Sequence, residues 1–69
     1  MWFFKQEKNA LPPIGVGVYA LFDRRGHTPQ IIIGVTMVKD GQLEFVAADE
    51  KKAPLVHTFY LVAWKDIEI

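Results

Sequence analysis

Residues 30–47, QIIIGVTMVKDGQLEFVA, consist of two runs rich in Val, Ile and Phe on either side of an Asp-Gly pair. β-Branched and aromatic residues are enriched in strands, and an Asp-Gly pair between two such runs is typical of a β-hairpin. The sequence therefore predicts two antiparallel strands, at residues 30–38 and 42–48, joined by a tight turn.

The length of this turn determines which side chains share a face, because a slip of one residue moves every side chain across the sheet. A two-residue loop, Asp40-Gly41, would place Glu44 among apolar neighbours. A three-residue loop that adds Lys39, with Gly41 left-handed, places Glu44 with Thr36 and leaves the other face wholly apolar. We predict the three-residue loop and a core face that contains Ile31, Ile33, Val35, Met37, Leu43, Phe45 and Ala47.

Three further runs predict strands, at residues 14–22, at residues 58–67 and, more briefly, at residues 2–6. In the first of them every second residue is apolar, which predicts a core face made of Ile14, Val16, Val18, Ala20 and Phe22. No segment carries a helical stripe. Residues 48–53 have acids before bases, which favours at most one short helix, ended by Pro54.

The 69 residues are 51% hydrophobic and contain no Cys. This composition excludes a disordered chain, a disulfide scaffold and a cysteine-zinc module. We predict one mainly β domain over residues 1–69, an antiparallel meander of four to five strands. It would be a curled sheet or a partial SH3-like or OB-like barrel, and a plain sheet with a short helix across one face is the alternative.

The residues that usually carry catalysis are scarce. Ser and Cys are absent, and His27 and His57 lack the spacing of a metal-ligand motif. We therefore predict that the protein is not an enzyme and has no metal site and no cofactor.

Nucleic-acid binding is the alternative function that the sequence leaves open. Small barrels bind single strands by stacking bases on aromatic side chains, and Arg24 and Arg25 could contact phosphates. However, the formal net charge is zero, and residues 1–35 have an excess of only two bases. A nucleic-acid-binding domain usually has a clear basic surface, so we do not expect nucleic acid as the partner.

The predicted last strand is apolar on both faces, because Tyr60, Val62 and Trp64 alternate with an apolar set. The resulting outward face would carry Tyr19, Leu21, Ile32, Val46, Tyr60, Val62 and Trp64. Monomers rarely expose such a patch, and Tyr and Trp are enriched at interface hot spots. We predict that this face is covered by Trp2–Phe4, by a homodimer contact or by another protein, and that the partner-binding residues are Tyr19, Tyr60, Val62 and Trp64.

The two ends of the chain resemble a family of short phage and prophage domains of unknown function. The likeness lies in an early Trp2, in the Leu-Pro-Pro-x-Gly turn at residues 11–15, and in a closing strand that contains Trp64. The closing Trp lacks the preceding His and the following prolines of that family, and no site residues can be transferred. The resemblance implies an origin in a mobile element, where small neutral domains often bind host or phage proteins.

The predicted function is therefore that of a protein-binding β module that inhibits or modulates a host protein. No apolar run is long enough to span a membrane, and residues 1–4 are too short for the apolar part of a signal peptide. We expect the protein in the cytoplasm, which would be the host cytoplasm if a phage encodes it.

Overall fold

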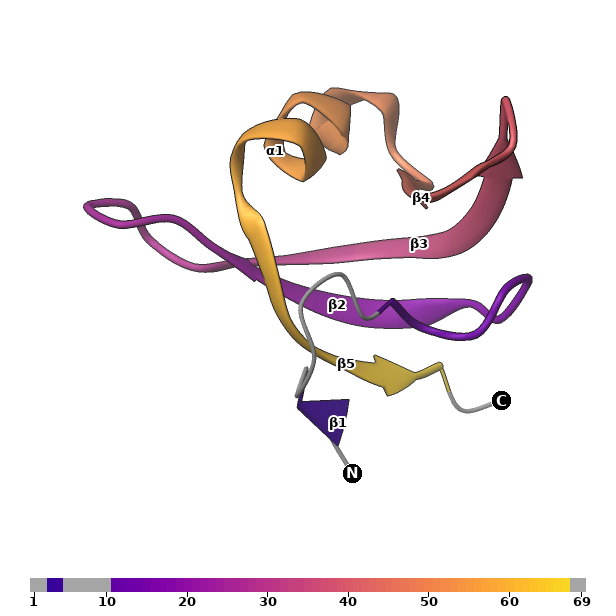
Figure 1. The fold of residues 1–69 in the computed structure, drawn as a ribbon. Helices are drawn as coiled ribbons and strands as arrows, with labels where there is room; N and C mark the ends of the chain where they lie inside the picture. The colour runs from indigo at the N-terminus through magenta and orange to yellow at the C-terminus, as the bar shows by residue number, and fades with distance from the viewer. Residues whose placement is uncertain (1–2, 5–10, 68–69) are drawn as a thin grey trace.

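A computed structural model describes residues 3–4 and 11–67 and shows one antiparallel sheet with a short helical segment (Figure 1). Its strands are β1 (Phe3–Phe4), β2 (Val18–Asp23), β3 (Gln30–Lys39), β4 (Gln42–Ala47) and β5 (Tyr60–Asp66). They lie in the order β1-β5-β2-β3-β4, so that β2, β3 and β4 form a meander and β5 returns beside β2. The prediction of a mainly β, unclosed antiparallel sheet is confirmed.

The helical segment begins at Glu50 as a short 3-10 helix, η1 (Glu50–Lys52), and continues as α1 (Ala53–Thr58). The carboxylate of Asp49 accepts a hydrogen bond from the backbone N–H of Lys51 at 3.0 Å, which caps the start. Pro54 was expected to end the helix, and this expectation is wrong. It lies in the first turn of α1, where its missing N–H has no helical partner to lose.

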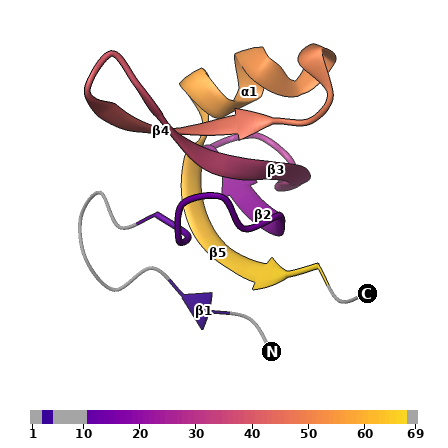
Figure 2. The same ribbon diagram turned by 90° about the vertical axis from the view of Figure 1, so that its right-hand side faces the viewer.

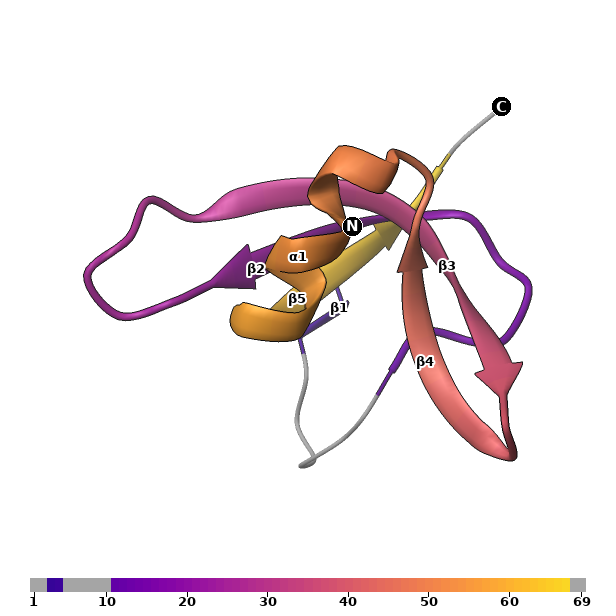
Figure 3. The same cartoon turned by 90° about the horizontal axis from the view of Figure 1, so that it is seen from above.

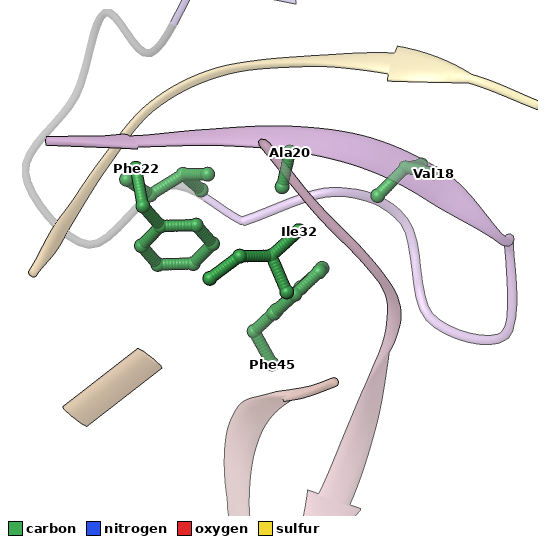
Figure 4. Packing of buried hydrophobic residues seen from close by; sticks show 6 residues of the cluster. Val18, Ala20, Phe22, Ile32 and Phe45 are labelled. Atoms are coloured by element: carbon green, nitrogen blue, oxygen red, sulfur yellow. The ribbon is translucent and has the colours of Figure 1, made fainter. Parts of the chain in front are cut away.

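The helix lies over one face of the sheet (Figure 2), which we call the inner face, and the opposite side is the outer face. Six buried apolar side chains of the inner face form the core (Figure 4): Val18, Ala20, Phe22, Ile32, Phe45 and Leu61. The rings of Phe22 and Phe45 meet with centroids 5.4 Å apart. The predicted core face of β2 is thus confirmed for its three strand residues. Ile14 and Val16 precede the strand and are exposed.

The predicted three-residue loop between β3 and β4 is wrong. Lys39 pairs with Gln42, so the loop consists of Asp40 and Gly41, whose φ angles are 50° and 76°. Positive φ at both positions gives the primed turn whose twist matches that of the flanking strands. This local geometry prevails over the better separation of apolar and polar side chains.

The predicted faces of β3 are consequently inverted. Ile32, Gly34 and Thr36 are buried on the inner face, whereas Ile31 and Ile33 are exposed on the outer face. The position of Gly34 in the core requires a residue without a side chain. The ring of Phe45 lies over it, and an added Cβ would come within 2.7 Å of that ring.

The end of the β3–β4 hairpin extends beyond the helix (Figure 3). Val38 and Leu43 pair with each other there. Both belong to the inner face by alternation, but they are 56% and 53% exposed because the core does not reach them. They form a natural control for the exposed residues of the outer face.

Candidate functional site

The outer face of the sheet presents exposed apolar side chains from neighbouring strands of the described chain. Residues directly opposite each other in an antiparallel pair share a face. Tyr19 pairs with Ile33, Leu21 with Ile31, and Val35 with Val46, so these pairs form one continuous surface. Its apolar members are Tyr19, Leu21, Ile31, Ile33, Val35, Met37, Val46 and Ala63.

Three large side chains of this face are open to solvent: Ile31 at 56%, Ile33 at 46% and Met37 at 43%. Among the described residues, eight large hydrophobic side chains are exposed, whereas seven hydrophobic residues, two of them alanines, are buried. Soluble monomers seldom leave adjacent apolar side chains uncovered in this way. The outer face is therefore the strongest candidate for a binding surface.

Charged side chains lie at the margin of this face and not at its centre. Lys65 of β5 pairs with Tyr19, and Glu44 of β4 pairs with Met37. Both are half-buried. A polar margin around an apolar centre is the usual anatomy of a protein interface.

The four predicted partner-binding residues do not lie together. Tyr19 belongs to the outer face and is half-buried. Tyr60, opposite Asp23, is 56% exposed at the start of β5. Trp64 pairs with Ala20 and packs against the inner core, so it is not part of the outer face.

An irregularity in β5 separates Tyr19 from Trp64. Phe22 pairs with Leu61, but Leu21 pairs with Ala63, which leaves Val62 as an extra residue. Such a β-bulge shifts the alternation by one position and sends the following side chains to the opposite faces. Strict alternation through Trp64, which the sequence favoured, therefore fails beyond Val62.

Sequence reasoning missed Ile31, Ile33 and Met37, which it assigned to the core, and it assigned the buried Ile32 to the outward face. The signal that could have placed them correctly is the Asp40-Gly41 pair, which strongly favours a two-residue primed turn.

The possible nucleic-acid contacts, Arg24 and Arg25, lie in the exposed loop between β2 and β3. The carboxylate of Asp23 accepts a hydrogen bond from the backbone N–H of Arg24 at 2.7 Å, so an acid lies next to both bases. This arrangement is that of a solvated turn, and it does not extend the apolar surface.

The two histidines lie in different elements of the fold. The ring of His27 contacts the edge of Phe59, with centroids 5.5 Å apart, while His57 lies exposed on α1. Within residues 3–4 and 11–67, the structure shows no group of three or more His, Asp or Glu side chains that could hold a metal ion.

A groove of about 600 Å³ lies on the inner side of the sheet, and its lining includes Phe22, Phe45, Phe59, Leu61, Tyr60 and His57. Most of these side chains belong to the core or pack against it. Substitutions in this groove would alter folding together with any binding. On the outer face, in contrast, Ile31, Ile33 and Met37 are exposed and can be changed without removing a core residue.

Comparison with protein-family profiles, curated proteins and solved structures finds no match to this chain. Of the helices in the described residues, none combines the length and the apolar character needed to cross a membrane.

Proposed function

We propose that this protein is a non-enzymatic protein-binding module, and that its outer face docks on an apolar surface of another protein chain. The observation that carries the proposal is the exposure of Ile31 and Ile33 beside Tyr19, and of Met37 further along β3, on the face that the helix leaves open. Burying such side chains releases about 25 cal/mol per Å² of apolar surface.

The resemblance to short phage domains supports a host protein as a binding target and an inhibitory or modulating effect on it. The Leu-Pro-Pro-x-Gly residues of that resemblance lead into the sheet beside β3, where the N–H of Gly15 donates to the carbonyl of Thr36 at 3.0 Å. They therefore hold this part of the chain against β3.

The test is a matched pair of double substitutions. Ile31→Asp/Ile33→Asp alters the outer face, and Val38→Asp/Leu43→Asp alters equally exposed residues at the hairpin end. Proteins captured from a host lysate would be identified, purified and titrated by isothermal calorimetry. We expect the outer-face variant to lose at least tenfold in affinity, as central apolar contacts do, while the hairpin variant keeps it.

Circular dichroism of both variants would verify that the sheet is intact. Equal loss of affinity in the two variants, or no loss in the outer-face variant, would contradict the proposal. Binding that falls steeply with salt and depends on Arg24 and Arg25 would instead favour nucleic acid.

A further inference from the structure

The shape of the molecule indicates what covers the outer face. The helix closes the inner side, and none of the described elements packs across the exposed Ile31 and Ile33. A sheet with one bare apolar face is half of a β-sandwich, in which two sheets pack about 10 Å apart. We propose, building on the function above, that the occupant is a second copy of this chain, in a twofold-symmetric face-to-face dimer.

The size of the molecule sets how much of it such a contact must cover. A stable interface buries about 800 Å² per partner, which is roughly 15% of the 5208 Å² surface of this chain. The molecule measures 30 × 29 × 25 Å, so a contact of this size would take up most of one side of it. Figure 1 shows β3 running nearly straight beneath the helix before it curves upward.

The charges at the margin are complementary between two copies. Lys65, on β5, pairs with Tyr19, and Glu44, on β4, pairs with Met37. In the sheet, β4 is the third strand from β5. With strands about 4.8 Å apart and about 3.4 Å per residue, these two positions are about 20 Å apart across the apolar centre. A twofold axis in the plane of the interface that bisects the line between these two positions at a right angle brings Glu44 of each copy to Lys65 of the other.

A homodimer also fits the overall charge and the size of the core. The formal net charge is zero, so two copies do not repel each other at long range. A chain of 69 residues has little core of its own, and small domains commonly gain stability by association. In the dimer the exposed isoleucines become part of a second core.

The first experiment measures the mass in solution by sedimentation equilibrium over a concentration series. We expect a dimer of the wild-type chain at micromolar concentration. Ile33→Asp should raise the dimer dissociation constant at least 100-fold, because it buries a charge at the centre of the contact. Leu43→Asp, the control at a similarly exposed site, should leave it unchanged.

The second experiment changes Glu44 and Lys65, which are half-buried at the margin of the outer face, so we expect the variants to fold. Glu44→Lys and Lys65→Glu should each weaken the homodimer about tenfold, because each places like charges opposite one another twice. An equimolar mixture of the two variants should restore association, since both pairs between unlike chains are again of opposite charge. A mixture that associates no better than either variant alone would overturn this arrangement.

The outcomes separate the dimer from the proposed function. A wild-type chain that stays monomeric up to millimolar concentration overturns the dimer. If such a monomer still binds another protein through Ile31 and Ile33, the function holds with a different partner. If neither association nor binding depends on the outer face, both proposals fail.

Discussion

The two faces of β3 differ in a way that reverses simple expectation. The inner face presents Ile32, Gly34 and Thr36, and all three are buried. The outer face presents larger apolar side chains, and Ile31 and Ile33 remain about half exposed. The more hydrophobic side of the strand is therefore the one that the core does not use.

The difference shows that a face of a strand becomes part of the core when other elements of the chain pack against it. Phe45 needs the space above Gly34, and the Asp40-Gly41 turn places it there. The helix then covers the same side, because Leu55, Val56 and Phe59 pack against the core cluster. Hydropathy alone cannot choose between two apolar faces, since both satisfy it.

The largest expected effect is on the free energy of unfolding, when one side chain on each face is replaced by alanine. Phe45→Ala removes an inner ring that is 7% exposed and touches Phe22, and it should lower the free energy of unfolding by about 3–5 kcal/mol. Ile33→Ala on the outer face should cost the monomer less than about 1 kcal/mol. Urea denaturation at a concentration where the protein is monomeric would measure both changes.

Equal losses from these two substitutions would contradict the assignment of the faces. A loss from Ile33→Ala that grows with protein concentration would instead report association, since anything that binds only the folded state stabilises it by mass action.

The next prediction concerns Gly34, whose missing side chain leaves room for the ring of Phe45 over β3. Gly34→Ala would place a methyl group against the backbone carbonyl oxygen of Val46 and against the Phe45 ring, and it should destabilise the fold by about 1–3 kcal/mol through overpacking. Gly17→Ala is the control, because its added Cβ would meet only the Cδ1 atom of Ile67 at 3.6 Å, an ordinary contact. If both variants melt like the wild type, Gly34 is not what admits the ring.

The sequence correctly predicted the fold class and the main strands, because β-branched runs and turn residues are local signals. The core face of β2 was also predictable at Val18, Ala20 and Phe22, because these residues alternate with Tyr19 and Leu21, which lie on the opposite face. The core face of β4, with Phe45 inward and Glu44 on the opposite side, was also predicted correctly. The faces of β3 were not, because two loop lengths gave two plausible registers.

The candidate site depends on those same uncertain steps. Tyr19 was predicted from its alternation, which continues without interruption in β2. Trp64 was misplaced because the bulge at Val62 leaves no mark in the sequence pattern. Of the segment Trp2–Phe4, which was predicted to cover the outer face, Phe3–Phe4 form β1 at the edge of the sheet beside β5, and Trp2 lies outside the described residues.

A smaller effect concerns the turn that sets the register. Gly41 has φ 76°, a left-handed conformation that an L side chain adopts only with strain. Gly41→Ala meets no neighbouring atom and should therefore cost only this strain, about 1–2 kcal/mol by thermal melting. Asp40→Asn, at a position where Asn tolerates the left-handed region, should leave stability nearly unchanged. A neutral Gly41→Ala would contradict the left-handed conformation of Gly41 in this turn.

The smallest expected effect is a gain in stability, at the one polar side chain among the buried residues of the described chain. Thr36 is fully buried on the inner face, and none of the described residues provides a hydrogen-bond partner for its Oγ1 atom. A buried hydroxyl without a partner destabilises a fold, whereas an apolar group of the same shape does not. Thr36→Val should therefore raise the free energy of unfolding by about 1 kcal/mol. Thr58→Val is the matched control, because its Oγ1 is exposed and donates to the carbonyl of Pro54 at 2.9 Å, and its loss should slightly destabilise α1. If Thr36→Val lowers stability, the inner face requires this hydroxyl, and the contrast between a purely apolar core and an open outer face would have to be revised.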